Sequence, residues 1–452
     1  MESSVRPEVV LVYPPYEDVM FHGGAYFTSI PLGVAYLAAV LEESGISVSV
    51  IDCSVEKVDV GGLARRILDA KPKVLGISVT SLSLRFVKRL IDEVREGGRT
   101  STIPKIAVGG PHIGADTGSS LLLGADVCFS GEADYSFAEY CKGVIDGGDG
   151  VSGIINCGLV NDINHLPYPA RHLFDEKRYR FVPIMASRGC PCNCMYCGMA
   201  GTPYRKRGLD SIRGEVEGMS RGRCLISLDF ADDVFTLDRQ HTMEIADLME
   251  EYNLSWACTT RADMVEGELL RYMGKRGCRH ISFGVESGSE EIRALVGKNV
   301  PDKAYVKAFK GCREAGIMTR AYIMVGFPGE TRRDMERTIS FTNSLKPDSY
   351  GYAMTIVLPN TRLMDYCVSK GLIRENYWVG YMRGNAGVPY FLPEGVVRSD
   401  IDALAYRQSK RFYLNPRHIA LRMKNAKNAG ELTDSLKAWG VYLADLIFNR
   451  TY

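Results

Sequence analysis

Four cysteines are crowded into one short stretch of the chain, and their spacing indicates a metal-binding loop. Cys190, Cys192, Cys194 and Cys197 lie in the segment CPCNCMYC, directly after an apolar stretch. Thiolates are the natural ligands of iron–sulfur clusters, and a tight C-x₃-C-x₂-C loop can present three of them to three irons of a [4Fe–4S] cubane. Cys190, Cys194 and Cys197 have this spacing, which would leave one iron open for a small chelating molecule.

Zinc is the main alternative occupant of such a loop. A structural zinc site usually takes four Cys or His ligands, often as paired C-x₂-C units. This chain has a single C-x₂-C pair, Cys194 and Cys197. Cys192 lies two residues from each neighbouring cysteine, which is a cramped spacing for a ligand. We therefore interpret Cys192 as a bystander and favour the iron–sulfur cluster.

The overall composition is that of a globular chain that is too long for one typical domain. Its 452 residues are 46% hydrophobic and 24% charged, with a formal net charge of +1. This balance gives no electrostatic argument for a nucleic-acid partner. The N-terminus lacks a signal-peptide pattern, and the sequence has no run of about 18 apolar residues. We therefore expect a cytoplasmic protein whose other cysteines, such as Cys53, Cys128 and Cys278, are buried thiols.

Residues 1–150 are predicted to form a doubly wound, Rossmann-like α/β domain. Short apolar segments such as VVLVY, VLGISVT and KIAVGG alternate there with helical patterns such as PLGVAYLAAVLEESG. Strands that are nearly all apolar indicate a parallel sheet that is covered on both faces. Ligands bind such sheets beyond the carboxyl ends of the strands. The polar and glycine-rich residues at these ends are Ser78, Thr80, Ser81, Gly109, Gly110, Pro111, Gly131 and Glu132.

The remaining sequence predicts a linker, a second series of βα units and a helical end. Residues 151–180, with two prolines in LPYPAR, are expected to be a linker. Between residues 181 and 360, six apolar segments from FVPIMAS to YGYAMTIVLP alternate with helical patterns. This order predicts a partial (β/α) barrel with its chemistry at the carboxyl ends of the strands. Residues 361–452 are expected to form a mostly helical substrate or lid region.

The cysteine loop resembles the signature of the radical S-adenosylmethionine (SAM) superfamily, with Tyr196 at its aromatic position. The later segments FADDVFT, GVESGS and MVGFPGE resemble, in the same order, the strand ends of that family. The resemblance implies that SAM chelates the open iron and is cleaved reductively to a 5′-deoxyadenosyl radical. Arg261 also fits the family pattern, although a salt bridge to a nearby carboxylate explains it equally well. The implied SAM-binding residues are Tyr196, Asp232, Arg261, Glu286, Ser287 and Gly326.

The N-terminal segments PLGVAYLAAVLEESG, GISVTS, VGGPHIG and FSGEADYSF resemble the cobalamin-binding domain of cobalamin-dependent radical SAM enzymes. The polar strand-end residues named above are then the implied cobalamin contacts. Cobalamin domains that supply an axial histidine carry D-x-H-x-x-G, which this chain lacks. His112 has Gly110 where the aspartate should be, and His22 also lacks it. The resemblance therefore implies cobalamin without a histidine ligand.

The family analogy implies methyl transfer from methylcobalamin to an unactivated carbon of a small-molecule or lipid-like substrate. It also implies an external electron donor of the flavodoxin or ferredoxin type. A radical rearrangement or oxidative cyclisation without methyl transfer is the first alternative. A methylthiotransferase would need a second set of N-terminal cysteines, and those before the loop are scattered. A non-enzymatic iron–sulfur protein would leave the SAM-binding motifs unexplained.

The region before the C-terminus contains a basic stretch. Residues 407–427 hold seven Lys and Arg and no Asp or Glu, interleaved with Leu, Ile and Met. A solvated helix face is one interpretation of this pattern. Peripheral contact with an anionic head group or a membrane surface is the other.

Overall fold

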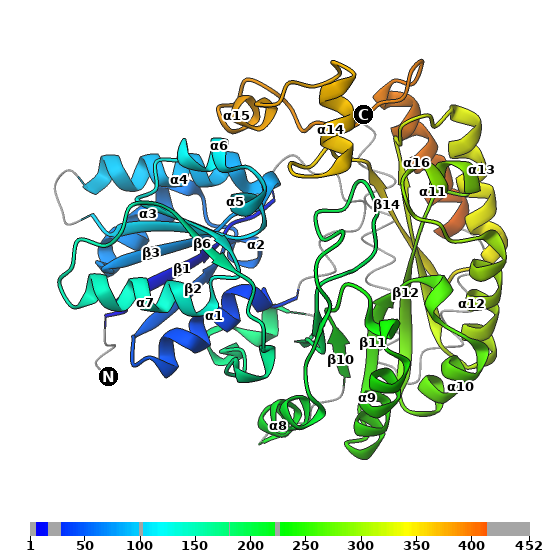
Figure 1. The fold of residues 1–452 in the computed structure, drawn as a ribbon, viewed down its shortest axis with the longest axis horizontal. Helices are drawn as coiled ribbons and strands as arrows, with labels where there is room; N and C mark the ends of the chain where they lie inside the picture. The colour runs from blue at the N-terminus through cyan, green and yellow to red at the C-terminus, as the bar shows by residue number, and fades with distance from the viewer. Residues whose placement is uncertain (1–5, 17–28, 99–102, 180, 222–226, 414–452) are drawn as a thin grey trace. The chain divides into compact units, whose positions relative to one another are not determined.

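The structure is a computed structural model that describes residues 6–16, 29–98, 103–179, 181–221 and 227–413. The chain forms two compact units, each made of segments that are distant in the sequence (Figure 1). Unit 1 comprises residues 1–19, 28–225 and 356–389, and unit 2 comprises residues 20–27, 226–355 and 390–452. The cysteine loop and the first βα series therefore belong to the same unit.

Unit 1 is built on a parallel sheet of six strands in the order β2-β1-β3-β4-β5-β6. The first five strands are those expected from the apolar segments, and their order is that of a doubly wound fold. Their carboxyl ends carry Asp52, Tyr13, Ser78, Gly109 and Gly131 along one edge of the sheet. The strands are β1 (Val9–Tyr13), β2 (Val48–Asp52), β3 (Val74–Ser78), β4 (Lys105–Gly109), β5 (Val127–Gly131) and β6 (Gly153–Gly158).

Helices cover both faces of this sheet, which explains its apolar strands (Figure 1). Alternate residues of β1, such as Val9 and Val10, enter two separate hydrophobic cores, one on each face. The core on one face contains α1 and α7, and the core on the other contains α3 and α4. The helices are α1 (Leu32–Glu43), α2 (Cys53–Glu56), α3 (Val60–Ala70), α4 (Leu84–Gly97), α5 (Pro111–Ala115), α6 (Thr117–Leu121) and α7 (Asp134–Ile145).

Strand β6 lies within residues 151–180, where the sequence suggested only a linker. It pairs with β5 in parallel register, from Val127↔Gly153 to Gly131↔Gly158. Its sequence, GIINCG, is mostly half-buried because β6 is the edge of the sheet. A short strand with glycine at both ends gives little apolar signal.

Unit 1 also contains short elements around the cysteine loop and two helices from the C-terminal third of the chain. The segment FVPIMAS forms the two-residue strand Pro183–Ile184 and, at its last residue, the start of the strand Ser187–Arg188. These elements are β7 (Pro183–Ile184), β8 (Ser187–Arg188), β9 (Arg205–Lys206), α8 (Leu209–Ser220), α14 (Arg362–Ser369) and α15 (Tyr377–Met382).

Unit 2 contributes parallel strands in the order β14-β13-β12-β11-β10. The strands are β10 (Ser227–Phe230), β11 (Ser255–Thr260), β12 (Cys278–Glu286), β13 (Met318–Val325) and β14 (Ser349–Met354). The helices are α9 (Arg239–Glu251), α10 (Gly267–Lys275), α11 (Glu290–Leu295), α12 (Asp302–Glu314), α13 (Arg332–Leu345) and α16 (Arg398–Tyr413). Strands and helices alternate along the chain, as the sequence predicts for a partial barrel.

The two faces of the unit 2 sheet differ in polarity. Aromatic side chains such as Phe230, Trp256 and Phe283 are fully buried on one face. The alternate positions carry Asp229 and His280, with Arg320 on the neighbouring strand. Burial raises the pKa of Asp229 to about 6, against the charge of Arg320, and lowers the pKa of His280 to about 3.

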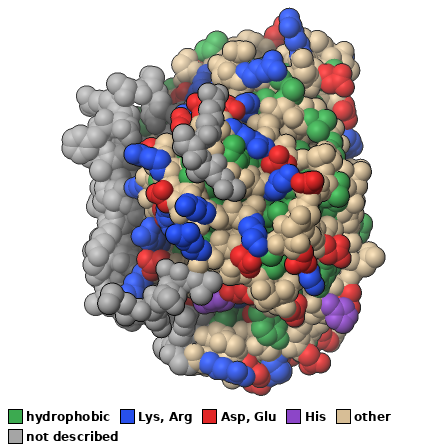
Figure 2. Space-filling model, turned by 90° about the vertical axis from the view of Figure 1, so that its left-hand side faces the viewer, with side chains coloured by type: hydrophobic (Ala, Val, Ile, Leu, Met, Phe, Trp, Pro, Cys, Tyr) green, Lys and Arg blue, Asp and Glu red, His purple; other side chains and the backbone are tan. Residues whose placement is uncertain are grey.

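The described surface carries no large field of one charge sign on the face shown in Figure 2. Lys and Arg side chains are interspersed there with Asp and Glu, in keeping with the net charge of +1. Among the described residues, no helix combines the length and the apolar character needed to cross a bilayer. Of the basic stretch 407–427, the end of α16 is described, and residues 414–427 lie outside the described part of the chain.

Candidate functional site

The cysteine loop spans residues 189–204 and is closed at its base by β8 and β9, which pair in antiparallel fashion. The backbone N–H of Cys190 donates to Thr202 Oγ1 at 2.8 Å. The N–H of Gly201 donates to the carbonyl of Cys192 at 2.8 Å, and that of Cys197 donates to the carbonyl of Cys194 at 3.2 Å. Hydrogen bonds within the loop therefore fix its conformation.

The loop has two further constraints. Gly189 has a φ of +91°, and a Cβ atom there would lie 2.1 Å from the carbonyl oxygen of Pro203, so only glycine fits. From the far side, the N–H of Leu363 donates to the carbonyl of Met195 at 2.9 Å, and Arg362 donates to the carbonyl of Asn193. Helix α14 thus holds the tip of the loop within unit 1.

The thiols of this loop suit a cubane cluster. Cys190 is buried, at 9% exposed, and Cys192, Cys194 and Cys197 are half-buried. Among the described residues, no three Cys, His, Asp or Glu side chains converge as ligands of a single metal ion. A cubane has no such requirement, because each thiolate binds a different iron. Tyr196 is half-buried between the last two thiols of the motif.

In unit 2, the carboxyl end of β12 has an unusual backbone at Glu286. This residue has a φ of +61°, a region that side chains other than glycine and asparagine seldom adopt. The register between β12 and β13 shifts at the same place, between Gly284 and Glu286. Strain of this kind concentrates at functional sites. Glu286 is 9% exposed, and its carboxylate accepts a hydrogen bond from Lys298 Nζ at 2.8 Å.

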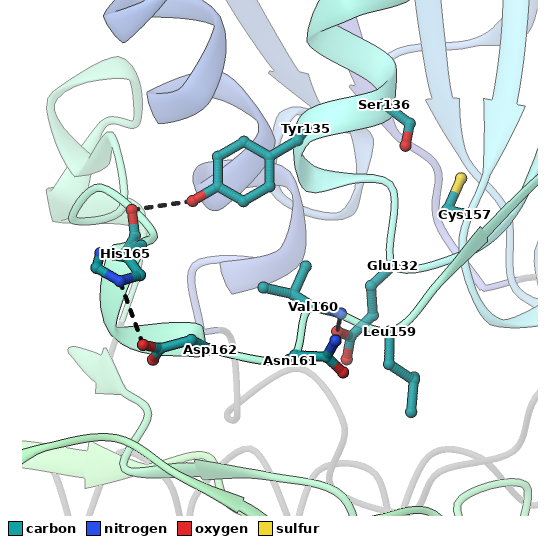
Figure 3. Close-up of a pocket in the computed structure, with 9 residues that line it drawn as sticks. All are labelled: Glu132, Tyr135, Ser136, Cys157, Leu159, Val160, Asn161, Asp162 and His165. Carbon is teal, nitrogen blue, oxygen red and sulfur yellow. Dashed lines mark hydrogen bonds and ion pairs between the residues drawn. The ribbon is translucent and has the colours of Figure 1, made fainter.

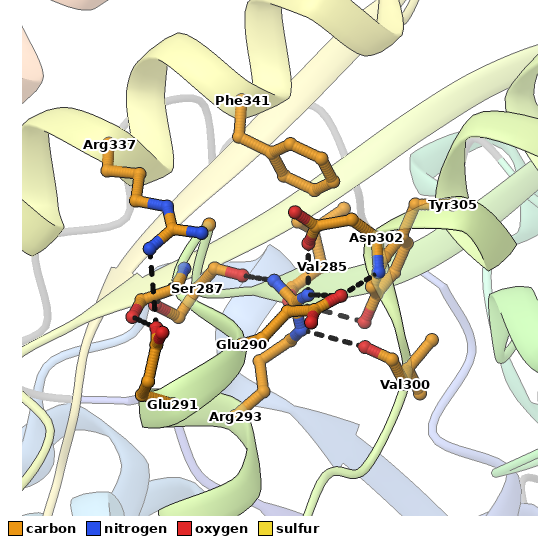
Figure 4. A network of polar contacts seen from close by, with 12 residues as sticks. Val285, Ser287, Glu290, Glu291, Arg293, Val300, Asp302, Tyr305, Arg337 and Phe341 are labelled. Atoms are coloured by element: carbon orange, nitrogen blue, oxygen red, sulfur yellow. Dashed lines mark hydrogen bonds and ion pairs between the residues drawn. The ribbon is translucent and has the colours of Figure 1, made fainter.

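A buried arginine fixes the turn that follows β12 (Figure 4). Arg293 is 1% exposed, and its Nε donates to the carbonyl of Val300 at 3.0 Å. Its Nη1 donates to the carbonyl of Ser287, and its Nη2 pairs with Asp302. Ser287 is itself fully buried, with its Oγ 3.3 Å from Thr338 Oγ1. The Ser287 hydroxyl is therefore part of the internal packing of this turn.

At the end of β13, Gly326 is enclosed by its own unit. It has a φ of +89°, and a Cβ atom there would lie 2.4 Å from the carbonyl oxygen of Phe391. The N–H groups of Gly326 and Phe327 donate to Glu330 Oε2 at 2.6 and 3.0 Å. Burial raises the pKa of Glu330 to about 7, although the two N–H donors lower it.

Two other residues of unit 2 that the sequence assigned to SAM binding, Asp232 and Arg261, follow β10 and β11. Asp232 is 4% exposed in the turn after β10. Arg261, directly after β11, makes a bidentate ion pair with Asp263, with Nε–Oδ1 and Nη2–Oδ2 distances of 3.0 and 2.8 Å. This salt bridge is one of the two roles that the sequence allowed for Arg261.

In unit 1, the turn after β4 is fixed by sterics. Gly110 has a φ of +103°, and a Cβ atom there would lie 2.9 Å from the backbone N and O of Val79. A Cβ atom on Gly109 would meet Phe129 at an ordinary contact distance of 3.6 Å. Gly109 thus has room within the protein for a side chain. Pro111 begins α5 directly after this turn.

His112 is held inside unit 1 by hydrogen bonds at both ring nitrogens. It is 1% exposed, its Nδ1 lies 2.8 Å from Ser81 Oγ, and its Nε2 lies 2.7 Å from Ser119 Oγ. Burial lowers its pKa to about 4, so the ring is neutral at pH 7. Thr80 and Ser83 form a capping box after β3, and the Thr80 hydroxyl donates to Ser83 Oγ. Since Ser81 Oγ is bonded to His112, both hydroxyls have partners inside the protein.

Glu132 lies at the rim of a surface cavity of about 430 Å³ (Figure 3). Its Oε2 accepts a hydrogen bond from the N–H of Val160 at 2.7 Å. Burial would raise the pKa of Glu132, but its bonds to Arg205 and Val160 lower it below its ordinary value. The residues that line the cavity are Glu132, Tyr135, Ser136, Cys157, Leu159, Val160, Asn161, Asp162 and His165.

Two family patterns match the chain in the order of these features. Residues 23–140 match the B12 binding domain, and residues 184–342 match the radical SAM superfamily. The chain therefore carries both domains of the cobalamin-binding radical SAM enzymes, a B12 binding domain and a radical SAM domain. Its cofactors are accordingly a [4Fe–4S] cluster, SAM and cobalamin, and its fold is the predicted Rossmann-like domain followed by a radical SAM barrel.

Curated relatives of the enzyme align over most of their length. An uncharacterized methyltransferase of Pyrococcus horikoshii is 24% identical over 436 residues, which cover 91% of this chain and 93% of the relative. The anaerobic magnesium-protoporphyrin IX monomethyl ester cyclase of Cereibacter sphaeroides is 24% identical over 444 residues, covering 90% and 70%.

A solved structure supports the fold. The radical SAM methyltransferase TsrM of Kitasatospora setae, with cobalamin and a [4Fe–4S] cluster bound, superimposes with a TM-score of 0.67. The alignment covers 88% of this chain and 90% of that one at 17% identity.

Sequence reasoning missed several residues around the site. Lys298 lies 12 residues after Glu286 in an ordinary polar segment, and only the buried ion pair reveals it. Trp378 and Tyr381 of α15 are fully buried in the core that contains α3 and α4, with the Trp378 ring 6.0 Å from that of His112. A signal was available for α15, because YWVGYM is an aromatic cluster in a polar region.

Proposed function

We propose that the enzyme transfers a methyl group to an unactivated carbon of a small-molecule substrate. When bound, the cluster and SAM supply a 5′-deoxyadenosyl radical, and cobalamin supplies the methyl group. The proposal rests chiefly on one observation: the cysteine loop and the cobalamin-type sheet are built into the same compact unit. The methyltransferase name of the Pyrococcus relative supports it.

Cys190, Cys194 and Cys197 are the proposed cluster ligands, with Cys192 outside the ligand set. Their place in one loop held by hydrogen bonds, with Cys190 buried and Cys194 and Cys197 half-buried, supports this assignment. For SAM we propose Tyr196, Asp232, Glu286 and Gly326. Ser287 contributes through its backbone in this proposal, because its hydroxyl is bonded to Thr338. Arg261 contributes through its ion pair with Asp263.

For cobalamin we propose the strand ends of β3, β4 and β5, with backbone contact at Gly109, Gly110 and Gly131. Gly109 supports this proposal. The protein has room for a Cβ atom at this position, so the glycine leaves space that a ligand could occupy. Ser78, Thr80, Ser81 and Pro111 shape the neighbouring turns. No histidine is proposed as an axial ligand, because both ring nitrogens of His112 are bonded to serine hydroxyls.

A cyclisation without methyl transfer is the second candidate. The Cereibacter relative is named as a cyclase, and it aligns with 90% of this chain. The two reactions require the same radical and differ in the fate of the substrate carbon.

The partners follow from the chemistry. Reductive cleavage of SAM requires an electron donor, which we propose to be a flavodoxin or ferredoxin. The polar face of the unit 2 sheet, with Asp229, His280 and Arg320, favours a substrate with polar groups over a plain lipid. Contact of residues 407–427 with an anionic membrane surface is a separate proposal, tested by co-sedimentation with anionic and neutral vesicles.

One experiment separates the two reactions. The protein is purified anaerobically, reconstituted with iron, sulfide and hydroxocobalamin, and analysed for metals; we expect about four irons and one cobalt per chain. With reductant, SAM and candidate substrates, methyl transfer should release S-adenosylhomocysteine together with 5′-deoxyadenosine. Release of 5′-deoxyadenosine alone would indicate rearrangement or cyclisation.

A further inference from the structure

Two arginines face each other at the base of the cysteine loop. Strands β8 and β9 pair Arg188 directly with Arg205, and the loop of residues 189–204 leaves from this pair. Like charges directly opposite one another destabilise an antiparallel pair. The base of the loop therefore needs neighbouring carboxylates to hold it closed.

Two carboxylates meet this need: Glu132, in the turn after β5, and Asp134, the first residue of α7. Arg205 binds Glu132 through two parallel bonds, with Nη1–Oε2 and Nη2–Oε1 distances of 2.7 Å each. Arg188 binds Asp134 in the same way, at 3.1 and 3.2 Å, and its Nη1 lies 3.5 Å from Glu132 Oε2. The four side chains are between 7% and 20% exposed. Bidentate pairs of this type add geometric specificity as well as energy.

The turn that supplies Glu132 is itself fixed. Gly131, before Glu132, has a φ of +103°, and a Cβ atom there would lie 2.5 Å from the carbonyl oxygen of Gly158. Val160, after β6, donates its N–H to Glu132 and accepts a bond from Arg205 Nη1 at 2.6 Å. Glu132 and Val160 are drawn side by side in Figure 3. The loop base is thus tied to two strands of the N-terminal sheet.

We propose that Glu132 and Asp134 are positioning residues for the iron–sulfur cluster. They clamp Arg188 and Arg205, and so hold the cysteine loop against the strand end at which cobalamin is proposed to bind. This inference rests on the proposed function only in assigning the cluster to the loop. It gives Glu132 a role in the cluster site in place of a direct cobalamin contact.

The test compares the double variant Glu132→Gln/Asp134→Asn with the control Asp126→Asn. Asp126 lies before the opposite end of β5 and has equivalent bonds, to Arg95 at 2.9 Å and to the N–H of Ile106 at 2.6 Å. Each protein is reconstituted with iron and sulfide. Release of iron to a chelator is then timed, and the electron paramagnetic resonance (EPR) spectrum of the reduced cluster is recorded with and without SAM.

We expect the double variant to lose iron about tenfold faster than the parent, because supporting residues of metal sites contribute effects of this size. Its EPR response to SAM should change, while Asp126→Asn behaves as the parent. Equal iron release in the double variant and the parent would overturn the proposal, as would equally fast release in Asp126→Asn. If the double variant does not fold, Arg205→Gln replaces it, with Arg205→Lys as the charge-preserving variant that should recover part of the effect. These readouts need neither cobalamin nor substrate, so a failure of the clamp is distinct from a failure of methyl transfer.

Discussion

Lys298 Nζ lies 2.8 Å from the carboxylate of Glu286, and both side chains are nearly buried at the carboxyl end of β12. The cation compensates the buried charge of the Glu286 carboxylate, whose backbone has a positive φ. The pair makes Lys298 the counter-charge of a residue that we assign to SAM binding.

Lys298→Met should therefore destabilise the protein strongly. Removal of one partner leaves a buried charge without compensation, which costs about 3–5 kcal/mol. Denaturant unfolding of the apoprotein measures this loss, and a binding titration should show weaker SAM binding by the reconstituted enzyme. Glu286→Gln combined with Lys298→Met should recover part of the stability but not the SAM affinity. A single variant as stable as the parent would contradict the assignment.

The cysteine variants test the ligand set directly. Cys190→Ala, Cys194→Ala and Cys197→Ala should each fail to retain the cluster, because each removes one of three thiolate ligands. Cys192→Ala is the matched control from the same loop and should retain about four irons per chain. Iron and sulfide analysis after anaerobic reconstitution measures both outcomes. Loss of iron from the Cys192 variant would show that the ligand set is different.

These tests rely on features that the sequence predicted well. The strand Val9–Tyr13 was predicted with its observed bounds, because a parallel strand covered on both faces is apolar at every position. The cysteine loop was also visible in the sequence, because its cysteines are close together and their type and spacing form a local motif. The assignment of three of them as cluster ligands stays a prediction.

The features that the sequence did not reveal depend on contacts between distant residues. Glu132 was expected to contact cobalamin because it follows the end of a strand. Its side chain instead pairs with Arg205, which lies 73 residues later in the chain. Trp378 packs near His112 although 266 positions separate them in the chain. Strand β6 was missed because an edge strand is half-exposed and needs few apolar side chains. Local pattern carries no information on such pairings.

The adjacent glycines after β4 give a matched pair of variants for the cobalamin side. Gly110→Ala should destabilise unit 1 by about 1–3 kcal/mol, because its φ of +103° and the 2.9 Å approach to Val79 leave no room for a Cβ atom. Gly109→Ala should keep the parental stability, since its Cβ atom would lie 3.6 Å from Phe129. Absorbance titration with hydroxocobalamin should nevertheless show weaker binding by Gly109→Ala. Parental cobalamin affinity in this variant would argue against ligand contact at Gly109.

Glu330 predicts a pH dependence of stability in unit 2. Burial raises its folded-state pKa from 4.5 to about 7, so the folded state favours the protonated carboxyl. The resulting stability is fully present below pH 4.5 and is lost as the pH rises through about 7, a change on the order of 3 kcal/mol. Unfolding midpoints at pH 5 and pH 8 measure the loss.

Glu330→Gln is the control for this pH effect. Its amide oxygen still accepts from the N–H groups of Gly326 and Phe327, but the side chain does not titrate. The variant should show a smaller difference between pH 5 and pH 8 than the parent. An unchanged difference would assign the pH dependence to other groups.

Trp378 predicts that α15 stabilises the N-terminal sheet from the C-terminal third of the chain. The Trp378 side chain is fully buried, and its ring centroid lies 5.3 Å from that of Tyr381. The backbone carbonyl of Tyr381 accepts a hydrogen bond from Arg85 Nε at 2.8 Å. Trp378→Ala should cost about 3–5 kcal/mol, because it opens a large cavity beside His112. Denaturant unfolding measures the loss, and hydroxocobalamin titration should show weaker binding, since His112 follows the Gly109–Gly110 turn.

Two controls separate packing from other effects. Trp378→Phe should cost less than the alanine variant, because the buried indole Nε1 has no hydrogen-bond partner among the described residues and none is lost. Leu372→Ala changes a side chain in the same segment that is 62% exposed, so stability and cobalamin affinity should stay at the parental values. If Trp378→Ala matched Leu372→Ala in both measurements, α15 would have no stabilising role in the cobalamin domain. If Trp378→Ala lost stability but kept its cobalamin affinity, the packing of α15 would not extend to the turn after β4.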